Sequence, residues 1–159
     1  MMMPRTRIPT SETVTYKGVT IEQLKNTIDS EKRQFTMVYP EIVWMVGDRH
    51  ISDAIVLSRI FFWYFPTDNP RKPSKLRRKL FGKLCLVKSA SEMAIETGLS
   101  PRTVEKAYKR LQQQGYITIS QNMFMGRKQS HIILNEELFV AHFFEIIRMQ
   151  FQAMNAKIE

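Results

Sequence analysis

The longest unbroken run of apolar residues in the chain, Ile60–Phe65, ends a mainly apolar stretch that starts at Ser52. A helix that is apolar on nearly all sides is usually buried at the centre of a domain. We therefore expect a central core helix over 52–65, in which the terminal aromatic cluster serves packing rather than cofactor binding. The apolar positions of this helix are Ala54, Ile55, Val56, Leu57, Ile60, Phe61, Phe62, Trp63, Tyr64 and Phe65.

A short helix, a tight turn and a second helix are predicted over 89–97 and 100–114. Ser89 or Ser91 can cap the first helix, because a serine side chain accepts a hydrogen bond from a free backbone N–H in the first turn. Gly98 follows this helix and supplies the turn, since glycine accepts a positive φ at little cost. The pattern thus predicts two helices joined by a short turn.

The second helix has clear start and stop signals. Ser100 can cap it, Pro101 occupies its first position, where a missing N–H costs nothing, and Gly115 ends it. Ala94 lies four residues before Gly98, and its small side chain lets the two helices cross closely. Core positions between the helices are expected at Met93, Leu99, Val104, Ala107 and Leu111. This spacing resembles the helix-turn-helix of many bacterial and phage DNA-binding proteins.

Alternating polar and apolar residues predict a β-hairpin directly after the second helix. Residues 116–119 and 131–134 form its strands, and Gly126 marks the turn between them. Residues 84–87 are a further short strand, in which Cys85 is expected to be a buried core residue. The order strand, helix, turn, helix, hairpin is that of a winged helix. We therefore expect a mainly α fold with a small β-wing, a winged helix-turn-helix with flanking N- and C-terminal helices.

Helices are expected on both sides of this unit. Residues 1–18 are polar and are interpreted as a flexible N-terminal arm. Thr20 starts a helix over 20–33 with a capping box. Asn135 caps a C-terminal helix over 135–156, and two glutamates in its first turn favour the helix dipole. The predicted organisation is an arm over 1–18, a winged-helix DNA-binding domain with preceding helices over 19–134, and a C-terminal helix over 135–159.

The C-terminal helix carries a wide apolar stripe. Packing against the 52–65 helix and the N-terminal helix would bury part of this stripe. One small domain can hardly cover so wide a face, however, and we therefore favour a homodimer. The stripe residues expected in the dimer interface are Phe143, Ile147, Phe151 and Met154.

Positive charge is concentrated in one segment of the chain. The net charge is +9, but residues 71–131 hold 14 Lys/Arg and three acidic residues, a net charge of +11. The rest of the chain is therefore slightly acidic. Seven of these basic residues fall in 71–83, which has no acidic residue. A solvated loop is one interpretation of that segment, and a phosphate-contacting loop is the one favoured beside a helix-turn-helix.

The second helix presents its polar face outward if its apolar residues fill the core. Arg or Lys near the start of such a helix can donate to guanine in the major groove, so Arg102, Thr103 and Lys106 are the candidates for base reading. The candidates for phosphate contact are Lys88, Ser100, Lys109, Arg110, Arg127, Lys128, Arg77, Arg78 and Lys79. The alternative is a solvated face, as in winged helices that serve as protein-interaction modules.

The likeness to known DNA-binding proteins extends upstream of the helix-turn-helix. It includes the run Asp53–Tyr64, DAIVLSRIFFWY, and the residues Leu86–Ser89, LVKS, that lead into the first helix. With the helix-turn-helix, they resemble the winged-helix domain of phage and plasmid replication proteins over residues 37–120. The resemblance implies binding of duplex DNA at an origin or operator, with replication proteins as further partners, and Arg102, Thr103 and Lys106 as the reading residues. Replication and transcriptional control on a mobile element both stay open.

Catalysis is not indicated by any motif. The three histidines are widely separated, and no metalloprotease, phosphate-loop or nucleophile-elbow pattern occurs, so we expect no enzyme, metal or cofactor. A nuclease built from distant residues is a weaker alternative. One cysteine allows no intrachain disulfide and fits a reducing cytoplasm, and no apolar run is long enough to span a membrane.

Overall fold

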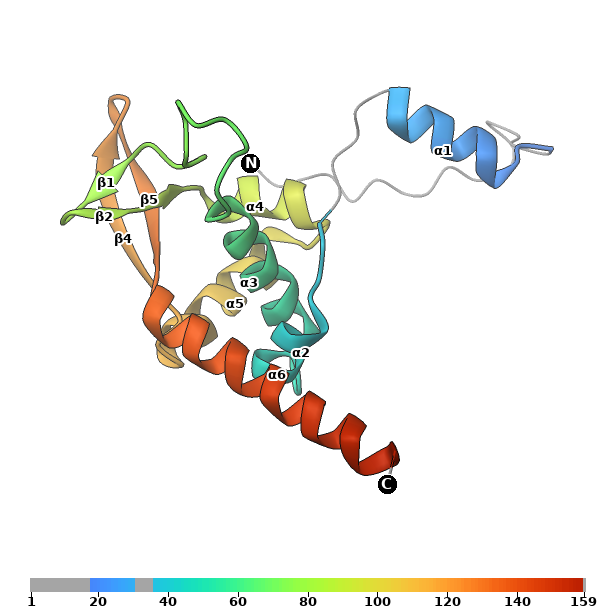
Figure 1. Cartoon of the computed structure of the whole chain (residues 1–159). Helices are drawn as coiled ribbons and strands as arrows, with labels where there is room; N and C mark the ends of the chain where they lie inside the picture. The colour runs from blue at the N-terminus through green and yellow to red at the C-terminus, as the bar shows by residue number, and fades with distance from the viewer. Residues whose placement is uncertain (1–17, 31–35, 159) are drawn as a thin grey trace. The chain divides into compact units, whose positions relative to one another are not determined.

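The computed structural model describes residues 18–30 and 36–158 (Figure 1). The chain divides into two compact units, residues 1–35 and 36–159. Apart from Gly18, the predicted N-terminal arm lies outside the described residues, as does the predicted helix beyond Ser30.

The first unit contains α1 (Ile21–Ser30), which starts where the capping pattern predicts. The backbone N–H of Thr20 donates to Gln23 Oε1 at 2.9 Å, and the N–H of Gln23 donates to Thr20 Oγ1 at 3.1 Å. These reciprocal bonds satisfy two backbone donors that a helix start leaves free. The predicted capping box is therefore confirmed.

The second unit is a mixed α/β fold of helices and small antiparallel sheets, and it is compatible with a winged helix. Its elements in chain order are α2 (Pro40–Val46), α3 (Ile51–Trp63), β1 (Lys79–Leu80), β2 (Lys83–Leu84), β3 (Leu86–Val87), α4 (Ala90–Thr97), α5 (Pro101–Gln113), β4 (Ile117–Phe124), β5 (Arg127–Leu134) and α6 (Glu136–Ile158) (Figure 1).

Helix α3 is the centre of this unit, as its composition predicts. It contacts α2, α4 and α5, and Val56, Leu57 and Ile60 are completely buried. The aromatic residues at its end pack against the first turns of α6, where the rings of Phe61 and Phe139 lie 4.6 Å apart. The prediction that this cluster serves packing is confirmed for Phe61.

The tyrosine at the end of α3 ties the helix to both sheets. The Tyr64 hydroxyl donates to the carbonyl of Leu84 at 2.9 Å and accepts from the N–H of Leu134 at 3.0 Å. Burial raises the pKa of Tyr64 to about 12, so the phenol stays protonated and keeps this donor at physiological pH. The aromatic end of α3 therefore fixes the sheets against the helices.

Helix α2 is an element that the sequence pattern did not predict. Pro40 occupies its first turn and Gly47 ends it after seven residues. A Cβ atom at Gly47 would lie only 3.1 Å from the Cβ of Ala54 and 2.9 Å from the carbonyl oxygen of Val43. Glycine is therefore favoured here, because a side chain would meet both the backbone of α2 and the Ala54 side chain of α3 and would force a shift.

The α4–turn–α5 unit agrees with the prediction in its caps, its turn and its core. Ser89 caps α4 in a capping box with Glu92, and Ser100 caps α5. Gly98 adopts a φ of 77°, the left-handed conformation that the turn needs. Four of the five predicted core residues, Met93, Val104, Ala107 and Leu111, are completely buried, and Leu99 is partly buried. Ala94, expected to allow the close crossing, is completely buried as well.

The strands form two antiparallel sheets. One has the order β3-β5-β4 and the other consists of β1 and β2. The predicted 84–87 strand is divided between the two, with Leu84 in β2, Leu86 in β3 and the buried Cys85 between them. The β4–β5 hairpin is longer than predicted, because pairing continues to Phe124 and Arg127 and leaves a two-residue turn.

Candidate nucleic-acid interface

Helix α5 has one buried and one exposed face. Val104, Ala107 and Leu111 point into the core, whereas Arg102 and Lys106 are exposed. This division follows the helical repeat, since residues three and four apart share a face. Lys109 is exposed further along the helix. The polar surface of α5 is therefore open to a partner along its length.

The start of α5 is held by its cap. The Thr103 N–H donates to Ser100 Oγ at 3.2 Å, and the two hydroxyl oxygens lie 2.8 Å apart. Thr103 is half-buried. Of the three predicted base-reading residues, Arg102 and Lys106 form no ion pair within the described part of the chain, and Thr103 has this local partner.

A groove of mixed polar and apolar character lies between α5 and the β4–β5 hairpin. Its lining includes the start of α4, and Tyr108 lies at its base with its hydroxyl buried and without a partner among the described residues. Burial raises the pKa of Tyr108, so this hydroxyl is a neutral donor. The other groove residues that can donate a hydrogen bond are Ser89, Ser91, Lys109, Gln112, Gln121 and Ser130. Arg127 and Lys128 are exposed at the hairpin tip beyond it.

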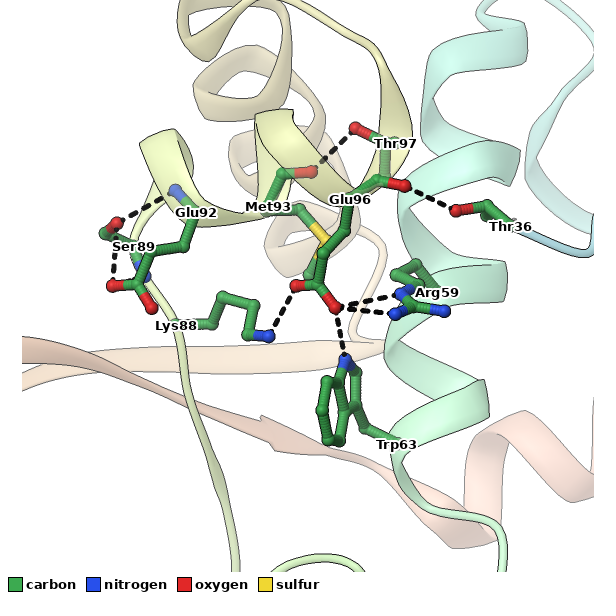
Figure 2. A network of polar contacts seen from close by, with 9 residues as sticks. All are labelled: Thr36, Arg59, Trp63, Lys88, Ser89, Glu92, Met93, Glu96 and Thr97. Carbon is green, nitrogen blue, oxygen red and sulfur yellow. Dashed lines mark hydrogen bonds and ion pairs between the residues drawn. The ribbon is translucent and has the colours of Figure 1, made fainter. Parts of the chain in front are cut away.

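The carboxylate of Glu96, on α4, interacts with two cations (Figure 2). It accepts from Arg59 Nη2 at 2.7 Å and from Trp63 Nε1 at 3.1 Å, and it forms an ion pair with Lys88. The Lys88 ammonium also lies 4.1 Å from the centroid of the Trp63 ring. The side chains of Glu96, Arg59 and Lys88 are only 10%, 4% and 13% exposed. Lys88 is thus neutralised inside the domain, and we remove it from the phosphate-contact set.

A second buried ion pair joins α5 to α3. Arg110 Nε and Nη2 both donate to the Asp53 carboxylate, at 2.8–3.0 Å, and Asp53 is only 1% exposed. This hydrogen bond to a carboxylate raises the pKa of Arg110 further. Arg110 therefore fixes α5 on the core helix, and we remove it as well from the phosphate-contact set.

Cations of the 71–83 segment divide into packed and free groups. Arg78 donates to the carbonyl of Met123 at 3.4 Å and lies 5.4 Å from the Phe124 ring centroid. The Lys75 ammonium lies 3.6 Å from the Phe62 ring centroid. Burial lowers the pKa of Lys75, and the nearby positive charge of Arg59 lowers it further. The exposed cations of the segment are Arg71, Lys72, Arg77, Lys79 and Lys83.

The two buried ion pairs were not predicted from the sequence. A signal for them exists, because Asp53 and Arg59 are charged residues within an otherwise apolar helix, and buried charges need partners. Within residues 18–30 and 36–158 there is no group of three His, Cys, Asp or Glu side chains that could hold a metal ion. No helix in the same part of the chain is long and apolar enough to cross a membrane.

Comparison with protein-family models, with curated proteins and with solved structures gave no match to this chain.

Proposed function

We propose that this protein binds a specific site on double-stranded DNA through a winged helix-turn-helix. Helix α5 enters the major groove, where Arg102, Thr103 and Lys106 read base edges. Ser100, at the N-terminus of α5, contributes its backbone and hydroxyl donors to phosphate contact. The DNA backbone is held by the remaining exposed cations, namely Lys109, Arg77, Lys79, Arg127 and Lys128, with Arg78 supporting the hairpin.

The main observation in support of DNA binding is the exposed basic face of α5, which lies beside a hairpin with a basic tip. Arg102 and Lys106 lie opposite the buried residues of the same helix, and Arg127 and Lys128 lie beyond the groove. An exposed helix fits the major groove of B-form DNA, and a hairpin beside it reaches the flanking backbone. The buried Asp53–Arg110 pair supports this arrangement because it holds α5 in one orientation.

The dependence of DNA affinity on salt tests this proposal. Five exposed phosphate-contacting cations predict a slope of log affinity against log salt of about −4.5. Arg127→Ala is expected to reduce the magnitude of this slope by about 0.9. Arg148→Ala on α6 is the matched control, because Arg148 is exposed but lies outside the proposed surface, and its slope should equal that of wild type. Binding that is insensitive to salt, or absent, contradicts the proposal.

We further propose that the protein is a homodimer joined by α6. Exposed apolar residues follow one another along this helix at spacings of four and three, the repeat of a coiled-coil seam. Phe143, which we predicted in the interface, is instead half-buried against the rings of Phe61 and Phe139. The exposed seam consists of Val140, Phe144, Ile147, Phe151 and Met154.

Sedimentation of wild type at micromolar concentration is expected to give a dimer. Phe151→Glu places a charge in the seam and is expected to give a monomer with an unchanged fold. Gln152→Glu introduces the same charge at the adjacent position outside the seam and should leave the dimer intact. A wild-type protein that sediments as a strict monomer contradicts the coiled-coil dimer.

The biological setting that we propose is replication initiation or control, or transcriptional regulation, on a phage or plasmid in the bacterial cytoplasm. In this proposal the protein acts by binding rather than by catalysis, and replication proteins are further candidate partners. The exposed seam of α6 also supports a second candidate, a winged-helix protein-interaction module in a replication or transfer assembly. Salt-sensitive duplex binding by wild type distinguishes the first candidate from the second.

A further inference from the structure

Two tight turns each expose a large apolar side chain at the tip. Phe81 and Gly82 close the β1–β2 hairpin, and Met125 and Gly126 close the β4–β5 hairpin. The side chains of Phe81 and Met125 are each 85% exposed, the highest values among the large apolar residues in the described part of the chain. Burial therefore does not account for an apolar residue at either tip.

Backbone preference does not account for them either. Phe81 and Met125 adopt φ values of 53° and 51°, and the glycines that follow adopt 75° and 83°. Two-residue hairpin turns with positive φ at both positions favour Asn-Gly, because Asn tolerates the left-handed conformation. A bulky side chain in this conformation is a strained choice, and such strain tends to be found at functional positions.

Basic residues surround both tips. Lys79 and Lys83 flank Phe81, Arg127 and Lys128 follow Met125, and all four side chains are exposed. The sequence has no acidic residue from 69 to 91 or from 106 to 135. An apolar tip within positive charge fits a partner that offers both phosphates and an apolar interior.

The two hairpins are held together by the packed arginine that precedes β1. Arg78 donates to the Met123 carbonyl on β4 and lies over the Phe124 ring. The Arg78 carbonyl accepts from the N–H of Cys85 at 2.9 Å, which fixes the other end of the β1–β2 hairpin. Both hairpins project from the same side of the helices in Figure 1. The two hairpins are therefore neighbours in the second unit.

We propose that Phe81 and Met125 are wedges that insert between base pairs of the bound duplex from its minor groove. Apolar side chains used in this way unstack a base step and kink the DNA, which brings more of the duplex into contact with the protein. Lys79, Arg127 and Lys128, which belong to the proposed phosphate contacts, hold the DNA backbone beside the inserted residues. The inference rests on the proposed function, because it requires duplex DNA as the partner.

Bending of a short duplex labelled with donor and acceptor dyes at its ends tests the wedges. The full-length wild-type protein is compared with the double variant Phe81→Asn/Met125→Asn. Asparagine removes the apolar side chain and suits the turn, so the melting temperature should be equal or higher. Wild type is expected to increase energy transfer between the dyes, and the double variant to bind about tenfold more weakly without that increase.

Met123→Asn is the matched control, since Met123 is also an exposed methionine on the hairpin but lies on the strand, and it should bend the duplex as wild type does. Equal bending by wild type and the double variant, or binding by wild type without bending, overturns the wedge and leaves the proposed function standing. Failure of wild type to bind any duplex overturns both. If, in that case, wild type but not the double variant sediments with anionic lipid vesicles, the tips bind lipid instead.

Discussion

Glu96→Ala is expected to lower the free energy of unfolding by about 3–5 kcal/mol, the range for breaking a buried ion pair by removal of one partner. The substitution removes the carboxylate that Arg59 and Lys88 share and the acceptor of the Trp63 indole N–H (Figure 2). Desolvation of the remaining cations is then no longer offset by this counter-charge. Chemical denaturation followed by circular dichroism measures the change.

Two further variants separate charge from shape at this position. Glu96→Gln keeps the size of the side chain and one acceptor oxygen, so it should be destabilising but less so than Glu96→Ala. Glu105→Ala removes an exposed glutamate from the surface of α5 and should change stability by less than about 0.5 kcal/mol. Equal stability of Glu96→Ala and wild type would contradict the structural role of this cluster.

Arg102→Ala and Lys106→Ala are expected to remove about 1–3 kcal/mol each from binding to the preferred site, if each side chain makes a bidentate contact with guanine. The loss should be much smaller for unrelated sequences, because only base-edge contacts carry sequence information. Competition binding with preferred and scrambled duplexes at one salt concentration measures this difference. Both residues are exposed on α5, so neither substitution should affect folding.

Lys109→Ala provides the comparison within the same helix. Lys109 is also exposed on α5, but further from its N-terminus, and we assign it to the phosphate backbone. Its loss should weaken binding to preferred and scrambled duplexes by the same factor. A variant of Arg102 that behaves like Lys109→Ala, with no loss of preference, would contradict the assignment of base reading to this end of the helix.

The elements with strong local signals could be predicted from the sequence. Serine caps, a glycine turn and a helical apolar repeat determine α4 and α5, since each signal acts within a few residues of the structure that it specifies. The buried state of Val104, Ala107 and Leu111 follows from the same repeat. Helix α2 was not predicted, because seven residues are too few to show a clear helical repeat of apolar positions.

Contacts between residues distant in sequence could not be predicted in the same way. Lys88 and Arg110 are basic residues close to the helix-turn-helix in sequence, so both were candidates for phosphate contact. Their pairing with Glu96 and Asp53 depends on how α3, α4 and α5 pack. The exposure of Phe81 is a similar case, because its place at a turn depends on the pairing of Leu80 with Lys83. Tertiary packing therefore changed the list of candidate site residues more than it changed the fold.

The most direct test of site-specific DNA binding by α5 is selection of bound duplexes from a random library at physiological salt, with Arg102→Ala in parallel. We expect wild type to enrich one sequence motif, as two inverted half-sites about one helical turn apart if the dimer binds symmetrically. The variant should lose preference at one position of each half-site. Absence of any enriched motif, or an identical motif for the variant, would contradict base reading by Arg102.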